Sequence, residues 1–419
     1  MMTDVLIIGA GMAGLSAGLA CRSRGIDFRL FEAGGETGGR AITRRTAAGT
    51  AVDLGAHWMH GEDTPLHGLL SHYGLTWRED RGQFLICENG TTRRDDGDWL
   101  EKVIDQEKAG RVRSGAAPDC PLPDLGVDGH ARQILTEFAL MWNGIDPPVE
   151  PSAREFLTDE NTPGGLQPDG GVGAVMARMA AEVGHDRIRL HTAVTRMTAI
   201  SDGVQVEAAD GTRWNARRAI FTGSLAVLKS GMVRFEPGLS RATLDHLDGL
   251  VMGEMNKIVV ELEAGFFDER GIEPDTAIEL LDARPPHFCH LRSAGLPTIN
   301  LYVSGRRARD IERLNADQAL GYVSALLKPV KALAGFEAHV VGEPILSHWV
   351  GNPFTRGAYS ACLPGYRRSG PRVEGAVVLS GDTFDDRFPA SLAGAFRSGQ
   401  AAVEKLCELG LHLEHHQAS

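Results

Sequence analysis

Three glycines near the start of the chain have the spacing of a dinucleotide-binding turn. Gly9, Gly11 and Gly14 form a Gly-x-Gly-x-x-Gly pattern directly after the apolar run of residues 5–8. Glycine here permits a tight turn, lets a pyrophosphate approach the backbone and lets the next helix pack closely, so that free N–H groups face the phosphates. Glu32 ends a second apolar run, and its carboxylate would bind a ribose and repel a 2′-phosphate. We therefore predict a dinucleotide site that disfavours NADP.

A second glycine cluster indicates a cofactor larger than NAD. Residues 31–40 read FEAGGETGGR, and the closing Gly-Gly-Arg would let the chain and Arg40 cover the pyrophosphate. Residues 53–61 read DLGAHWMHG, where Gly55 and Ala56 would let the backbone pass close to a flat ring. Simple nicotinamide dehydrogenases need no such second glycine cluster.

Composition narrows the class of protein. A hydrophobic content of 42% and a charged content of 23% are those of a globular protein, and no apolar run approaches the ~18 residues of a membrane span. The net charge of −12 argues against a nucleic-acid partner. The first strand begins within a few residues of the start, so we expect no signal peptide, no membrane partner and a cytoplasmic location.

Cysteine and histidine spacing predicts neither a metal site nor disulfides. The six cysteines include no Cys-x-x-Cys pair, and no His-Glu-x-x-His pattern occurs. We expect reduced thiols.

The expected elements make an α/β protein whose cofactor domain is assembled from separated segments. We expect a mixed, polar stretch at residues 76–160 with helical pieces such as 131–142. Strands are expected at 28–31, 188–190, 204–207, 219–222, 257–263 and 376–380. Helices are expected to start within 169–180 and to span 316–327 and 391–409. Residues 1–75, 161–235 and 346–419 would form the cofactor domain. Residues 76–160 (helical) and 236–345 (sheet and helices) would form a second domain.

Taken together, these motifs resemble the FAD-dependent amine oxidases, especially the polyamine-oxidase branch with the monoamine oxidases as relatives. Three further stretches agree in order: VMGEMNKIVV at 251–260, WVGNPFTRGAYSACLP at 349–364 and SGDTFDDRFPASLAGAFRSG at 380–399. The resemblance implies a Rossmann-type, GR2-like FAD-binding domain interleaved with an α+β substrate-binding domain.

The resemblance also implies roles for particular residues. Lys257 would hold a water at flavin N5, Tyr359 would form one wall beside the flavin, and His60 or His57 would anchor a distal amine or hold water. A lysine that extends from a strand edge and histidines that are purely structural remain alternatives. The cofactor contacts would come from Gly9, Gly11, Met12, Ala13, Gly14, Glu32, Ala33, Gly39, Arg40, Gly55, Ala56, His57, Trp58, Val194, Trp349, Gly381, Asp382, Ser391 and Leu392.

Four positions depart from the family pattern. Asp382 replaces the usual glutamate but would still reach a flavin ribityl hydroxyl. Ala358 stands where monoamine oxidases carry the cysteine that links the flavin, so FAD should be non-covalent. Ser391 falls on the second tyrosine of the monoamine oxidases, which leaves that side of the site open. Ser224 replaces a proline, a change with no chemical interpretation from sequence.

The expected reaction is oxidation of a primary or secondary amine to an imine, with reoxidation by O2 to H2O2, in a monomer or homodimer. Three alternatives remain open. An L-amino-acid oxidase would need an arginine for the substrate carboxylate, and Arg93 is one of several candidates. A flavin-dependent desaturase or isomerase would lack Lys257 and the Tyr359 segment. A non-catalytic flavoprotein would have little use for Lys257.

Overall fold

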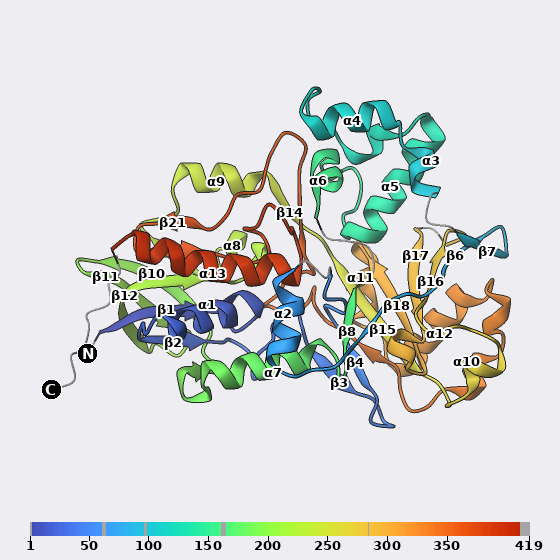
Figure 1. Ribbon diagram of the computed structural model, residues 1–419, viewed down its shortest axis with the longest axis horizontal. Helices are drawn as coiled ribbons and strands as arrows, with labels where there is room; N and C mark the ends of the chain where they lie inside the picture. Colours follow the sequence, from blue (N-terminus) through green and yellow to red (C-terminus); the bar gives the residue numbers. More distant parts are fainter. Residues whose placement is uncertain (1, 61–63, 96–98, 161–164, 284, 411–419) are drawn as a thin grey trace.

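The computed structural model describes residues 2–60, 64–95, 99–160, 165–283 and 285–410. Two sheets dominate it, with a helical layer over the second (Figure 1). Within the described residues, no helix has the length and apolarity needed to cross a membrane.

The first sheet has nine strands and gathers segments from the start, middle and end of the chain. Its centre is parallel and has the order β22 (Val377–Leu379), β12 (Arg213–Phe221), β1 (Thr3–Ile8), β2 (Phe28–Phe31) and β9 (Ile188–Arg189). The other members are β10 (Val194–Ile200), β11 (Gly203–Ala208), β13 (Arg234–Glu236) and β21 (Arg372–Glu374). A parallel sheet covered on both faces needs strands that are apolar on both sides, and β1 is accordingly buried from Val5 to Ile8.

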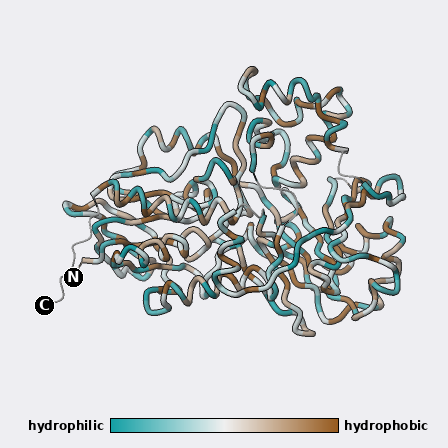
Figure 2. The backbone as a smooth tube through the Cα atoms, in the orientation of Figure 1, coloured by the Kyte–Doolittle hydropathy of each residue, from teal (hydrophilic) through white to brown (hydrophobic). Residues whose placement is uncertain are grey.

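Helices cover both faces of this sheet. One face carries α1 (Met12–Ser23), α2 (Pro65–His72), α7 (Val172–Val183) and α13 (Leu392–Glu408), and the other lies near α8 (Leu225–Lys229) and α9 (Arg241–Asp248). Apolar and polar stretches alternate along these helices, as expected where one side packs on a sheet and the other meets solvent (Figure 2).

The second sheet has seven strands: β19 (Ile345–Leu346), β15 (Met255–Glu261), β18 (Thr298–Ser304), β17 (His287–Leu291), β16 (Thr276–Leu280), β6 (Phe84–Glu88) and β7 (Thr91–Asp95). Ile258, Leu301 and Cys289 belong to one apolar cluster, under α10 (Phe266–Glu269), α11 (Arg306–Ile311) and α12 (Ala316–Leu327). Because side chains alternate along a strand, their neighbours Lys257, Tyr302 and Phe288 face the other way, toward the first sheet.

The remaining elements complete the core around these sheets. The helical layer contains α3 (Trp99–Val103), α4 (Gln106–Ser114), α5 (Gly129–Asn143) and α6 (Ala153–Thr158). There are also three two-stranded pairs. β3 (Thr43–Arg45) and β4 (Ala51–Asp53) are consecutive strands, whereas β5 (Trp77–Glu79) with β8 (Leu166–Pro168), and β14 (Leu250–Met252) with β20 (Ser360–Cys362), join distant segments.

The prediction that residues 76–160 form a helical segment is incomplete. That stretch contains β5, β6 and β7, and β6 and β7 form the edge of the second sheet. β7 is a polar edge strand whose side chains are exposed except at Asp95, so it lacks the apolar alternation that announces a strand. The Asn89-Gly90 turn between β6 and β7 was the available signal.

Candidate active site

A cavity of about 770 Å³ lies between the two sheets, at the carboxyl ends of the parallel strands. Gly9, Glu32, Thr222 and Gly381 follow β1, β2, β12 and β22, and all four line it. Lys257 of β15 lines it from the second sheet. This is where open α/β sheets bind ligands, because the ends of several strands and their loops meet there.

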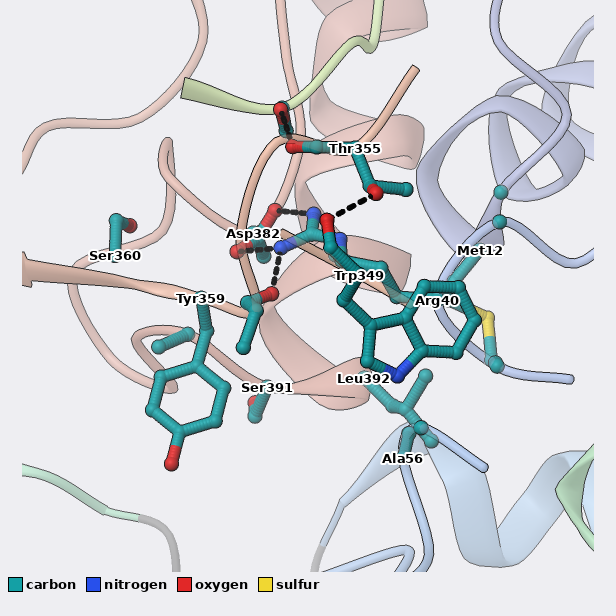
Figure 3. Close-up of a pocket in the computed structure, with 18 of the residues that line it drawn as sticks. Met12, Arg40, Ala56, Trp349, Thr355, Tyr359, Ser360, Asp382, Ser391 and Leu392 are labelled. Atoms are coloured by element: carbon teal, nitrogen blue, oxygen red, sulfur yellow. Dashed lines mark hydrogen bonds and ion pairs between the residues drawn. The ribbon is translucent and has the colours of Figure 1, made fainter. Parts of the chain in front are cut away.

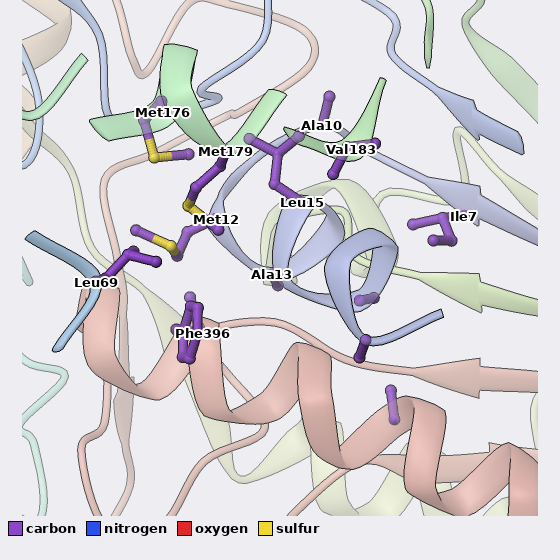
Figure 4. Close-up of a cluster of buried hydrophobic side chains, with 14 of the residues drawn as sticks. Ile7, Ala10, Met12, Ala13, Leu15, Leu69, Met176, Met179, Val183 and Phe396 are labelled. Atoms are coloured by element: carbon purple, nitrogen blue, oxygen red, sulfur yellow. The ribbon is translucent and has the colours of Figure 1, made fainter. Parts of the chain in front are cut away.

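The first turn of α1 points its unpaired N–H groups at this cavity. Gly11 is the N-cap and supplies no side chain to cap the helix, and Gly11, Met12 and Ala13 line the cavity. Packing of α1 against α13 and α7, through Met12, Phe396 and Met179, holds the helix in place (Figure 4). An uncapped helix N-terminus suits an anionic pyrophosphate.

Two glycines in this region are required by close backbone contacts. A Cβ on Gly14 would lie 1.8 Å from the carbonyl oxygen of Gly9, and one on Gly55 would lie 1.8 Å from that of Arg40. Gly14 therefore packs the turn without lining the cavity, whereas Gly55 both lines it and brings the chain against Arg40.

The carboxylate of Glu32 is held at the dinucleotide end of the cavity. Its Oε2 accepts from the backbone N–H of Ala10 at 2.7 Å, and its Oε1 accepts from that of Gly34 at 2.7 Å. The carboxylate lines the cavity and retains lone pairs for ribose hydroxyls. An anion site, a fixed acid and a long cavity that continues between the sheets together fit FAD.

Arg40 and Asp382 form an ion pair across the cavity wall. Arg40 Nη2 lies 2.6 Å from Asp382 Oδ1, and Arg40 Nη1 donates to the backbone carbonyl of Ala358. Figure 3 shows these contacts beside Trp349. The pair joins the second glycine cluster to both C-terminal motifs, which sequence order alone does not bring together.

Lys257 is buried, 4% exposed, and its ammonium faces the cavity. Its Nζ donates to the backbone carbonyl of Asp53 at 3.2 Å and lies 4.7 Å from the centre of the Tyr302 ring. Burial lowers the pKa of Lys257 from 10.5 to about 7, and the Asp53 carboxylate opposes that change. A lysine on an interior strand with these contacts does not extend from a strand edge to solvent.

The neighbour of Lys257 positions Trp349. Asn256 points to the opposite side of β15, where its Nδ2 donates to the Ala308 carbonyl at 2.8 Å. Its Oδ1 accepts from the backbone N–H of Trp349 at 2.8 Å, and Trp349 Nε1 donates to the Leu54 carbonyl at 2.8 Å. The indole is therefore fixed in the cavity wall.

Aromatic side chains form the end of the cavity near Lys257. Tyr359 donates from its hydroxyl to the backbone carbonyl of Trp142. Trp58 is parallel to Tyr302, with ring centres 6.1 Å apart, and its Nε1 donates to Asp80 Oδ2 at 2.6 Å. The rings of Tyr359, Trp142, Trp58 and Tyr302 make a largely apolar wall, a setting that favours a neutral amine.

His60 and His57 occupy different environments. His60 lines the cavity, with its ring 6.1 Å from that of Trp58. His57 is partly buried with its ring edge-on to Trp58, its Nε2 2.7 Å from Ser293 Oγ and its Nδ1 3.6 Å from an oxygen of Asp53. Burial lowers the pKa of His57 below its ordinary value.

Of the other predicted cofactor contacts, some line the cavity and some do not. Gly39, Ala56, Ser391 and Leu392 line the cavity, and Ser391 also caps α13 by accepting from the N–H of Gly394 at 3.1 Å. Ala33 does not line the cavity, and Val194 lies in the apolar cluster on the other face of the first sheet.

Sequence reasoning missed three contributors. Tyr302 and Trp142 line the cavity. The signal for Tyr302 was the alternation in β18, where Asn300, Tyr302 and Ser304 interrupt an otherwise apolar strand. Ser224, unexplained from sequence, caps α8 and donates to the Thr355 carbonyl at 2.6 Å, which ties the first sheet to the loop after Trp349.

Comparison with known families and structures agrees with this arrangement. Residues 126–407 match the flavin containing amine oxidoreductase family, and residues 7–73 match a NAD(P)-binding Rossmann-like domain. Polyamine oxidase 2 of Arabidopsis thaliana is 26% identical and aligns with 96% of this chain and 87% of its own. Human lysine-specific histone demethylase 2 is 23% identical over 96% of this chain and 53% of its own.

Solved structures share the fold. Putrescine oxidase bound to putrescine superposes with a TM-score of 0.79 at 21% identity, covering 97% of this chain and 99% of that one. Cyclohexylamine oxidase from Brevibacterium oxydans superposes with a TM-score of 0.81 at 20% identity, covering 98% and 99%. With the family match spanning most of its length, the chain belongs to the flavin containing amine oxidoreductases.

Proposed function

We propose that this protein oxidises a C–N bond of a primary or secondary amine, with polyamines as the favoured class, and passes the electrons to O2. For a primary amine, one alkylammonium and one O2 give one iminium and one H2O2, and water then converts the iminium to an aldehyde and ammonium. FAD, when bound, supplies the hydride acceptor. The observation that carries the proposal is the buried Lys257, which lines the flavin cavity beside an aromatic wall.

The protein's part is to hold the amine neutral and to manage protons. An amine that keeps its proton has no lone pair with which to release a hydride, and a wall of aromatic rings disfavours the charged form. Lys257, with a pKa of about 7, can exchange a proton near neutral pH and can hold a water through its N–H groups.

The charged groups of the cavity favour an amine over an amino acid. Among the described lining residues the one arginine is Arg40, which is paired with Asp382. Arg93 lies on the exposed edge strand β7, 3.6 Å from Asp95. A substrate carboxylate would therefore lack an arginine partner at the reacting end.

Polyamines are favoured by the acids on the cavity wall beside the helical layer. Glu155 and Asp159 line it there, and Glu155 already binds Arg368. With His60 on the wall near Trp58, a long polar amine would have partners for its distal nitrogens.

FAD is proposed to bind without a covalent bond. Ala358 lies where a linking thiol would be needed, and no cysteine is found among the described residues that line the cavity. Cys362 is buried away from it, and burial raises the pKa of its thiol to about 12.

A peroxide-release assay of the purified yellow protein tests the proposal. Putrescine, spermidine and spermine should release more H2O2 than benzylamine or cyclohexylamine, and L-amino acids should release none. Lys257→Met should lower the signal, whereas Lys229→Met, at an exposed lysine outside the cavity, should not. Peroxide from L-amino acids alone would refute the assignment.

A further inference from the structure

A second, smaller cavity adjoins the flavin cavity. It has a volume of about 100 Å³, well above the ~10–15 Å³ that one water needs. Its wall includes the exposed residues Asp169 and Gly170. Its buried polar residues offer partners for ordered water: Asp53, Gln167, Ser293, Thr298 and Asn300. His57 is the one residue, of those described, that lines both cavities.

His57 has the contacts of a proton carrier. Its Nε2 lies 2.7 Å from Ser293 Oγ, which also lies 3.4 Å from Gln167 Oε1. The single hydroxyl proton of Ser293 can point to the imidazole or to Gln167, so rotation of this hydroxyl accommodates either tautomer of His57. On the other side, Asp53 Oδ2 lies 3.6 Å from Nδ1 and can stabilise an imidazolium.

The same residue, Asp53, connects His57 to the reacting end of the flavin cavity. Its backbone carbonyl accepts from Lys257 Nζ, while its carboxylate faces His57. The Tyr302 hydroxyl lines the flavin cavity in this region and is buried without a partner among the described residues. A water bound to the Tyr302 hydroxyl would extend this set of polar groups into the flavin cavity.

We propose that His57 carries the ammonium proton of the substrate from the flavin cavity through Ser293 to the second cavity and so to solvent. This inference rests on the proposed amine oxidation. The substrate N–H bond breaks and leaves its electron pair on nitrogen. A neutral His57 gains that proton at Nδ1, on the Asp53 side, and releases one from Nε2 to Ser293 Oγ, whose own hydroxyl proton passes to a water in the second cavity. The charged and titratable groups that face His57 are Asp53, Asp80, Asp275, Lys257 and His290.

The kinetic experiment separates proton movement from flavin chemistry. Holoenzyme is mixed without oxygen with putrescine or benzylamine, and flavin bleaching is followed together with proton release to a pH indicator. His57→Ala should keep its FAD but slow both signals by about 10²-fold or more, and added imidazole should restore them. His57→Gln, which can still bond to Ser293 but cannot carry a proton, should be slow without rescue, and the exposed His185→Ala should behave as the parent.

A substrate-free measurement decides the point independently. In ¹⁵N-histidine spectra, the His57 signal is identified as the one that is missing in His57→Ala. In the parent this signal should show both tautomers and rapid exchange of the ring proton with water. In Ser293→Ala that exchange should be slower. A single tautomer whose proton is protected from exchange would overturn the relay, as would His57→Ala bleaching and releasing protons at the parent rate. If no amine bleaches the parent, the proposed function fails, and the spectra still decide whether His57 exchanges protons with solvent.

Discussion

Replacing Lys257 by methionine should have an effect on stability that depends on pH. A pKa of about 7 in place of 10.5 corresponds to as much as about 5 kcal/mol of unfavourable free energy for keeping the ammonium buried. Methionine is similar in length and carries no charge, so Lys257→Met removes this penalty.

The direction of the pH dependence follows from proton binding. Below pH 7 the lysine is protonated in both folded and unfolded states, and the folded protein bears the full penalty. Between pH 7 and 10.5 the unfolded state binds more protons, so the parent becomes more stable as pH rises. The advantage of the methionine variant should therefore be largest near pH 6 and should vanish near pH 10.5.

Urea unfolding of parent and variant at several pH values measures this difference. Lys229→Met is the matched control, because Lys229 also donates to backbone carbonyls, at 3.1 and 3.0 Å, but is exposed. A difference between parent and Lys257→Met that stays constant with pH would refute the picture of a buried ammonium. In stopped-flow experiments the same variant should keep FAD but reoxidise the flavin about 10²-fold more slowly. Unchanged rates in both half-reactions would make the lysine structural.

Three further predictions follow from individual contacts. Because Ala358 offers no thiol, acid precipitation should release all the flavin into the supernatant, and colour kept in the pellet would contradict non-covalent binding. Tyr359→Phe should retain substantial activity but lose about 1–3 kcal/mol of stability, because the Trp142 carbonyl loses its donor. Tyr359→Ala should slow flavin reduction at saturating amine. Ser224→Ala should lower stability by about 1–2 kcal/mol in a denaturation assay, because α8 loses its cap and the Thr355 carbonyl its partner; an unchanged midpoint would show that these bonds are dispensable.

The cofactor half of the site was readable from the sequence because its signals are local. The turn from Gly9 to Gly14 and the acid at Glu32 are each set by neighbours within a few residues, where steric and periodic constraints act directly. The family resemblance added Lys257, Tyr359 and Asp382 through short, ordered motifs. In the structure Glu32, Lys257, Tyr359 and Asp382 all line one cavity.

Pairings between distant segments were decided by the tertiary structure. Arg40 meets Asp382 across 342 positions, and Ser293 meets His57 across 236. Such contacts depend on strand register and on how the two sheets face each other, and a register shift of one residue would turn Tyr302 away from Lys257. The local sequence specified which side chains could do chemistry. The packing of two sheets around a shared cavity determined which of these side chains meet, because only the folded chain brings distant segments within hydrogen-bonding distance.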